Sequence, residues 1–324
     1  MLEAAVRLVP EGLLRPATRL YRLAQRPEIW RLVIGMSIVL LGAAYARALI
    51  HVYKGDDYVY WETVHNATGG AAIYLNQADV RLHGYLYSPA FIQALWPLLS
   101  LPWLVFHGIW IATLMLITYW LARPWVVLLT FPFIFKTFGV PILAIPRHEL
   151  DSGNIFLLLT LAVVAGFRWP WTFSFLLLTK ATPGVVLLWF VVRREWRNLA
   201  IALGCTAVIA AVSFAIAPHL WFDWVNLLRT GSGLPEPDFA IHFLPLYPRL
   251  AIAVVITVLG ARTNQRWVLP IAAMLALPFI ADTALMMLFG VLPLLRNDPW
   301  TRVPARPAEP PEGQRPGGEP AVQG

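Results

Sequence analysis

Apolar runs separated by short polar breaks occupy most of the chain. Because a bilayer-spanning helix needs ~20 predominantly apolar residues, several of these runs are short or tilted as spans. The pattern nevertheless predicts an all-α, polytopic transmembrane protein with about 10 membrane helices. The runs cover residues 32–51, 88–103, 104–121, 125–145, 152–168, 170–192, 198–217, 246–261, 267–281 and 283–296.

The polar segments divide the chain into three parts. Residues 1–31 precede the first run and contain six arginines, which predicts an amphipathic cytoplasmic helix followed by a retained signal anchor. Residues 32–296 form the predicted transmembrane domain, with outer loops over about 52–103 and 218–245. Residues 297–324 are rich in Pro, Gly and Glu, and we expect them to be a disordered cytoplasmic tail.

Basic residues set the expected orientation. The N-terminal arginines and the loop "RREWR" (193–197) belong on the cytoplasmic side. This arrangement places 52–87 and 218–245 on the same, extracytoplasmic side.

The middle of the chain allows two topologies. In the first, 88–103 crosses the membrane. In the second, "YSPAFIQALWPLLSLP" is a surface or re-entrant helix of the outer loop, and 170–192 is a hairpin of two short helices around "TKATPG". Arginine placement favours the second alternative slightly, since Arg123 and Arg168 then face inward.

Composition supports the membrane interpretation and removes other classes. The chain is 58% apolar and only 13% charged, whereas a soluble domain is ~25% charged. The single cysteine, Cys205, allows neither an internal disulfide nor a thiolate metal site. The net charge of +7 comes from arginines beside apolar runs, which indicates membrane anchoring rather than nucleic-acid binding.

Charged residues inside or beside apolar runs are the candidate functional groups, because charge at membrane depth is expensive. Lys180 lies within "FLLLTKATPGVVLLW" and is either a snorkelling structural charge or a cation that binds an anionic group. The cluster "RHELDSGN" precedes another apolar run. Asp151 or Ser152 could cap a helix starting near Ile155, but capping does not require the remaining charges, which are Arg147, His148 and Glu149.

The acidic pair in "KGDDYVYW" lies at the edge of the first run. Asp56 or Asp57 could cap a surface helix starting near Tyr58. A carboxylate here could instead act as a general base, with its like-charged neighbour raising its pKa. Holding Mg²⁺ or Mn²⁺ is a third use of paired carboxylates.

Four segments in order resemble glycosyltransferase family 87, the bacterial polyprenol-phosphate-mannose-dependent transferases of the GT-C superfamily. Asp56, Tyr60, Gly70 and Tyr74 fit the spacing of the family's first outer loop. The other three segments are "YSPAFIQALWPLLSLP", "LDSGNIFLLLTLAVVAGF" and "LLLTKATPGVVLLWFVVRREWR". The chain departs from the family pattern at Ala90, where a second proline is usual, and at Asn154, where glutamine is frequent.

The resemblance implies an inverting sugar transfer from a polyprenyl-phosphate donor, with mannose expected, to a glycan or glycolipid hydroxyl on the outer face of the inner (plasma) membrane. Asp56 takes the role of the catalytic base, with Asp57 as the alternate. Lys180 takes the role of the donor-phosphate cation, supported by Arg147 and His148. The substrate cavity is expected to include Tyr60, Glu149, Asp151, Asn154 and His242.

Two other classes stay open from the sequence. A transporter or flippase of a lipid-linked or anionic substrate often shows internal repeats, and none is visible. A non-catalytic membrane subunit would use the acidic pair as a helix cap and Lys180 as a structural charge.

Overall fold

The computed structural model describes residues 55–69, 72–74, 84–122, 149, 152–231 and 244–296, with a few single residues between 28 and 50. The predicted span over 125–145 and the predicted tail over 297–324 lie outside the described residues, as does all of the segment 1–31 except Glu28 and Arg31.

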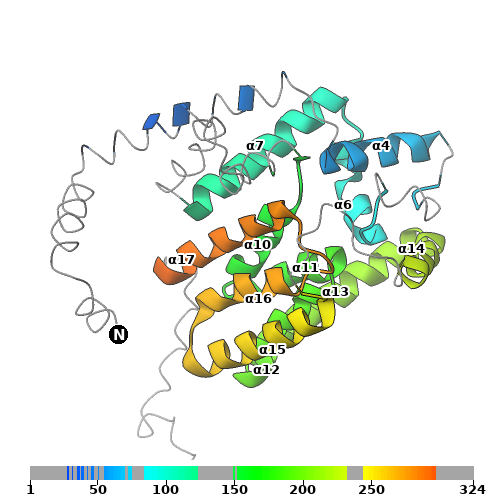
Figure 1. Cartoon of the computed structure of the whole chain (residues 1–324). Helices are drawn as coiled ribbons and strands as arrows, with labels where there is room; N and C mark the ends of the chain where they lie inside the picture. Colours follow the sequence, from blue (N-terminus) through cyan, green and yellow to red (C-terminus); the bar gives the residue numbers. More distant parts are fainter. Residues whose placement is uncertain are drawn as a thin grey trace, which may run out of the picture.

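Within the described part, every regular element is a helix, which confirms the all-α prediction (Figure 1). The α-helices are α4 (Asp56–Thr68), α6 (Pro89–Leu99), α7 (Trp103–Ala122), α10 (Phe156–Ala165), α11 (Phe173–Thr179), α12 (Leu188–Val192), α13 (Trp196–Ile216), α14 (Pro218–Gly231), α15 (Leu246–Thr263), α16 (Leu269–Leu275) and α17 (Val291–Arg296). The 3₁₀ segments are η4 (Pro170–Thr172), η5 (Thr182–Leu187), η6 (Arg266–Val268) and η7 (Asp282–Gly290).

Three of these helices, α7, α13 and α15, are long and apolar enough to cross a membrane. The other apolar helices are 10–17 residues long: Pro89–Leu99, Phe156–Ala165, Pro170–Thr179, Thr182–Val192, Arg266–Leu275 and Asp282–Leu295. The prediction of about 10 membrane helices is therefore not confirmed. Several apolar runs that looked continuous in the sequence are divided into shorter helical pieces.

The run 170–192 shows how the division arises. α11 ends at Thr179, and Lys180 adopts an extended conformation with φ −139° and ψ 99°. Pro183, at the start of η5, has no N–H with which to continue the helical hydrogen bonding of α11. The break gives the two short helical segments that the second topology requires.

The segment 88–103 also fits that topology. α6 spans only 11 residues, about 16 Å at 1.5 Å per residue, against a hydrocarbon core of ~30 Å. Pro89 occupies its first position, and α7 begins at Trp103 directly after Pro102. α6 is therefore too short to span alone, and in Figure 1 it lies with α4 and α14 at one end of the molecule.

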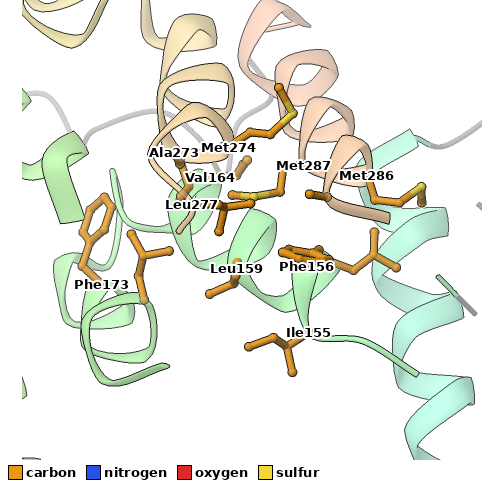
Figure 2. Packing of buried hydrophobic residues seen from close by; sticks show 14 of the residues in the cluster. Ile155, Phe156, Leu159, Val164, Phe173, Ala273, Met274, Leu277, Met286 and Met287 are labelled. Atoms are coloured by element: carbon orange, nitrogen blue, oxygen red, sulfur yellow. The ribbon is translucent and has the colours of Figure 1, made fainter. Parts of the chain in front are cut away.

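The protein core surrounds α10. Figure 2 shows Phe156 and Leu159 of α10 packed among Met274 of α16 and Met286 and Met287 of η7, all of them buried. α13 has the opposite character, because its apolar side chains are mostly exposed. Leu203, Val208, Ile209, Val212, Phe214 and Ile216 are among them. An apolar outer face of this size is what contact with lipid requires.

Arg249 is a buried cation on the spanning-length helix α15. Its side chain is 1% exposed and donates hydrogen bonds to backbone carbonyls: to Leu244 O at 2.8 Å, Leu277 O at 2.9 Å and Pro278 O at 3.0 Å. The last two carbonyls follow the C-terminal end of α16, which leaves such groups without helical partners. Arg249 therefore fixes the chain that leads out of α16 against α15.

Substitution of Arg249 by Leu should destabilise the protein, because several buried carbonyls lose their donor. We expect a loss of about 3 kcal/mol or more, since each unsatisfied buried polar group costs about 1–3 kcal/mol. Thermal unfolding in detergent would measure the effect. The matched control is Arg262→Leu on the same helix, where the side chain is exposed. Equal melting temperatures for the two variants would contradict the assignment.

Candidate functional site

The acidic pair opens helix α4. Asp56 and Asp57 are its first two residues and Gly55 is its N-cap residue, without a side-chain cap hydrogen bond. The helix therefore begins two residues before Tyr58, where the sequence placed its start. Acidic groups in a first turn interact favourably with the helix dipole. The two carboxylates nevertheless have different surroundings.

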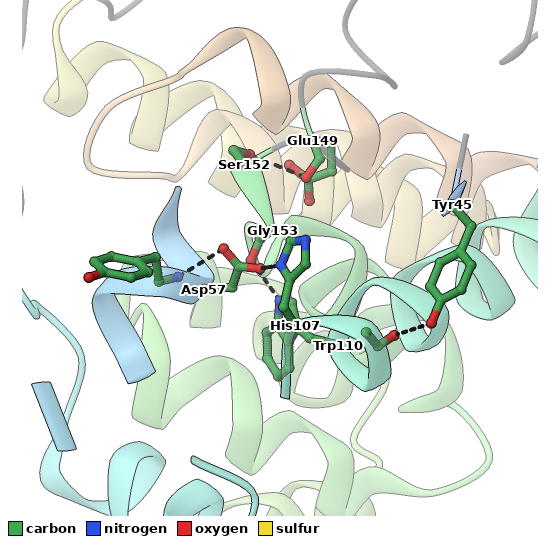
Figure 3. Close-up of polar contacts among 9 residues, drawn as sticks. Tyr45, Asp57, His107, Trp110, Glu149, Ser152 and Gly153 are labelled. Atoms are coloured by element: carbon green, nitrogen blue, oxygen red, sulfur yellow. Dashed lines mark hydrogen bonds and ion pairs between the residues drawn. The ribbon is translucent and has the colours of Figure 1, made fainter. Parts of the chain in front are cut away.

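Asp57 is completely buried against α7. Its Oδ2 lies 2.7 Å from Nδ1 of His107, and its Oδ1 accepts a hydrogen bond of 2.8 Å from the backbone N–H of Tyr58 (Figure 3). Burial raises the pKa of the Asp57 carboxyl, while the hydrogen bond and charge of His107 act in the opposite direction. Both carboxylate oxygens are engaged inside the protein.

Two glycines let the segment 152–154 touch the start of α4. A Cβ atom on Gly55 would overlap the backbone of Ser152, and a Cβ on Gly153 would overlap the carboxyl group of Asp57. Gly153 also has φ +61°, a conformation that favours glycine. Glycine is required at both positions for this close approach.

Asp56 is half-buried and faces the same segment from the other side. The side-chain amide of Asn154 donates a hydrogen bond to Asp56 Oδ2. The amide oxygen of Asn154 in turn accepts a hydrogen bond of 2.7 Å from the backbone N–H of Ile155. The orientation of Asn154 is thus fixed, and it holds the Asp56 carboxylate from one side.

Lys180 lies at the break between α11 and η5, half-buried among aromatic rings. Its Nζ is 4.5 Å from the ring centroid of Phe156, 5.4 Å from that of Phe279 and 5.8 Å from that of Tyr87. Ring faces attract a cation at these distances. Electrostatic attraction also links the ammonium group to Asp56 and Glu149.

Glu149 lies beside this pair, and burial raises the pKa of its carboxyl well above the usual range. Its side chain is fully buried, and Oε1 accepts a hydrogen bond of 3.3 Å from the backbone N–H of Leu157 near the start of α10. Oε2 has no hydrogen-bond partner among the described residues. Ser152 does not cap α10, since its hydroxyl donates to Glu149 O instead. Glu149 thus accepts from the N–H of Leu157 in the first turn of α10, and Asn154 accepts from that of Ile155, the N-cap residue.

Tyr60, expected from the sequence to line the substrate cavity, lies in a buried aromatic cluster. It is 2% exposed, contacts the rings of Tyr85, Phe91 and Trp110, and its hydroxyl donates to that of Tyr87 at 3.3 Å. Burial, then the neighbouring Tyr87, raises the pKa of the Tyr60 hydroxyl well above its usual range. Tyr60 therefore packs inside the protein near the start of α4, and its hydroxyl is neutral.

The structure brings four of the predicted residues into one region: Asp56, Glu149, Asn154 and Lys180. Asp57 turns away from them toward His107. Tyr60 lies in the buried aromatic cluster. The other four predicted site residues lie outside the described part of the chain, namely Arg147, His148, Asp151 and His242.

His107 and Trp110 were missed from the sequence. The signal for His107 was a lone imidazole within an otherwise apolar run, which indicates a polar interaction inside the helix bundle.

The described residues contain no group of three or more His, Cys, Asp or Glu side chains arranged to hold a metal ion. The two adjacent carboxylates do not converge, because Asp57 is committed to His107 and Tyr58. Of the acidic pair considered from the sequence as a Mg²⁺ or Mn²⁺ site, the Asp57 carboxylate is therefore already occupied by protein partners.

Fold and site together define a class of protein: an all-helical membrane protein with a small cluster of ionisable residues among aromatic side chains. The family model of glycosyltransferase family 87 matches residues 85–289. This match covers more than half of the chain. The chain therefore belongs to that family and is a membrane glycosyltransferase. No curated protein and no solved structure matches the chain. The matched region includes Asn154 and Lys180 but begins after the acidic pair.

The close approach at Gly153 gives a test of the site's geometry. Gly153→Ala should lower the melting temperature, because the methyl group displaces the Asp57 carboxyl and the left-handed backbone is strained by about 1 kcal/mol or more. Gly204→Ala is the control, since a Cβ there meets nothing within 4 Å in the middle of α13. That variant should be as stable as the parent protein or slightly more so. A melting temperature for Gly153→Ala equal to that of the control would contradict the packing described.

Proposed function

We propose that the protein transfers a sugar, with mannose as the expected sugar, from a polyprenyl-phosphate donor to an acceptor hydroxyl on the extracytoplasmic face. The observation that carries the proposal is the electrostatic interaction between one half-buried carboxylate, Asp56, at the start of α4, and one half-buried cation, Lys180, at the end of α11. A base and an anion-binding cation are the two groups that such a transfer requires.

Asp56 is the proposed general base in preference to Asp57. The carboxylate of Asp57 is fully buried, with both oxygens engaged by His107 and Tyr58. Asp56 is partly exposed and is oriented by Asn154. A general base must come within hydrogen-bond reach of the acceptor hydroxyl, and of the two only Asp56 has the exposure for this.

Lys180 is the proposed binding group for the donor phosphate, with Arg147 and His148 in support. Three aromatic rings close to its ammonium group reduce its contact with water, and a charge interaction strengthens as the local dielectric falls. An anionic phosphate brought beside Lys180 would therefore be held firmly. The same attraction stabilises the phosphate as the leaving group.

The reaction is then a single displacement. The acceptor hydroxyl transfers its proton to Asp56 while its oxygen forms a bond to the anomeric carbon of the sugar. The bond from that carbon to the phosphate oxygen breaks, and polyprenyl phosphate leaves with the electron pair. Attack opposite the leaving group inverts the anomeric centre, so that a β-linked donor gives an α-linked product.

Glu149 and Asn154, together with Asp151 and His242, are proposed to line the sugar or acceptor cavity. Glu149 supports this through its buried Oε2, which has no hydrogen-bond partner within the described part and could accept from a sugar hydroxyl. Family membership weighs against a transporter or flippase. The non-catalytic alternative is separated from the proposal by the two substitutions that follow.

Asp56→Asn should reduce transfer about 10²- to 10⁴-fold, the usual contribution of a positioned general base. The measurement is incorporation of labelled mannose from polyprenyl-phosphate mannose into acceptor in membranes. Glu62→Gln is the matched control, because Glu62 is a half-buried acid on the same helix. Full transfer by Asp56→Asn, with normal membrane insertion, would remove Asp56 from the catalytic role.

Lys180→Ala should weaken use of the donor, seen as a raised apparent KM for polyprenyl-phosphate mannose of about tenfold or more, equivalent to about 1.4 kcal/mol. Arg168→Ala is the control, since Arg168 is an exposed cation that also lies over an aromatic ring, that of Trp169. An unchanged donor KM in Lys180→Ala would assign Lys180 a structural role only.

A further inference from the structure

Two side chains of α7 that carry N–H groups point toward Asp57 at the start of α4 and toward Gly153. His107 and Trp110 are three residues apart, so they lie on the same face of the helix. Both are buried, with exposed fractions of 1% and 4%. Figure 3 shows them side by side, directed at the start of α4 and at the segment 152–154.

Each of the two makes one short hydrogen bond to a different segment. Nδ1 of His107 lies 2.7 Å from Asp57 Oδ2, at the start of α4. Nε1 of Trp110 donates to Gly153 O, also at 2.7 Å. An ionised Asp57 carboxylate can only accept, so in that state the imidazole donates from Nδ1. One face of α7 therefore anchors two segments that are distant in the sequence.

The anchored residues are the direct neighbours of the proposed working pair. Asp57 follows Asp56, and Gly153 precedes Asn154. The amide of Asn154 donates to the carboxylate of Asp56. The hydrogen bonds from α7 thus lie one residue away from each partner of the Asp56–Asn154 contact, and together they fix both ends of it.

A simple helix start does not explain this arrangement. An acidic residue that only interacts with the helix dipole lies at the surface, whereas Asp57 has 0% exposure and must therefore be compensated by a partner. The absence of a Cβ on Gly153 provides the room for its carboxyl group. The burial of Asp57 beside His107 is explained if it fixes the position of the neighbouring carboxylate, Asp56.

We propose that His107 and Trp110 are positioning residues, which act through Asp57 and Gly153 to hold Asp56 in the orientation needed to accept the proton of the acceptor. The inference rests on the proposed function. Misplacing a reacting group by about 1 Å can reduce a rate about 10²-fold. Loss of either anchor should therefore lower kcat and leave donor binding at Lys180 unchanged.

The test uses the full chain, reconstituted in liposomes with polyprenyl-phosphate mannose as donor. His107→Leu and Trp110→Phe each remove one hydrogen bond, and we expect kcat to fall about 10- to 100-fold, with the donor KM unchanged within about twofold. His107→Asn retains a donor near the position of Nδ1 and should restore much of kcat. Activity is expressed per amount of folded protein.

Matched controls are present in the same region. Trp103 is also on α7, and its indole N–H has no hydrogen-bond partner in the described chain, so Trp103→Phe should leave kcat near the parent value. His65 lies on α4, with its Nδ1 3.0 Å from Trp61 O, and His65→Leu tests loss of an imidazole away from Asp57. Trp110→Phe keeps the test decisive where His107→Leu fails to fold.

Three results would overturn the proposal. The first is an unchanged kcat in Trp110→Phe and in any folded His107 variant, and the second is an equal fall in the controls. The third is a raised donor KM at constant kcat, because the residues would then act on binding. Failure of this inference is distinguishable from failure of the proposed function. If Asp56→Asn abolishes transfer while the α7 variants stay fully active, only the positioning role is lost.

Discussion

The contact between Asp57 and His107 is the interaction on which the site depends. It joins the start of α4, which follows the first apolar run, to the spanning-length helix α7. A buried carboxylate is strongly destabilising without a partner, so this contact determines where α4 can begin. Once Asp57 faces inward, the helix geometry turns Asp56 toward the segment 152–154.

The broken apolar run at Lys180 supplies the opposite charge. In a continuous helix over 170–192, Lys180 would be an ordinary residue in the middle of the helix. The break leaves it in an extended conformation, among rings that come from three separate segments: Tyr87, Phe156 and Phe279. Arg249 contributes indirectly, because it fixes the carbonyl of Pro278 next to Phe279. Proline and a buried arginine therefore shape the surroundings of the lysine without touching it.

The sequence was sufficient for the features that depend on composition and local pattern. The all-helical class, the family and the break near "TKATPG" follow from apolar runs, motif order and the position of Pro183. The spacing from Asp56 to Tyr74 favoured the first carboxylate over the second as the base, and that assignment stays a prediction. The prediction of about 10 membrane helices was not confirmed within the described residues, because an apolar run shows that a segment is buried but does not show whether its helix is continuous.

The contacts of the site could not be predicted, because they join residues far apart in the sequence. His107 and Asp57 are separated by 50 positions, and Asn154 and Asp56 by 98. A histidine within an apolar run indicates a polar contact but not its partner. Likewise, Gly153 looks like part of a polar turn until the carboxyl of Asp57 is found where its side chain would be.

The extent of the family match gives this arrangement a further meaning. The match begins at Tyr85 and covers His107, Trp110, Gly153, Asn154 and Lys180, but not the acidic pair. The matched region therefore contains the side chains that contact the start of α4, while the proposed base, Asp56, lies on α4 itself. With both anchors on one face of α7, the placement of Asp56 depends on the rigidity of a single helix rather than on the loops around it. A carboxylate at the start of a short helix outside the long spans can then hold a fixed orientation toward Asn154, because each of the two contacting segments is anchored one residue away.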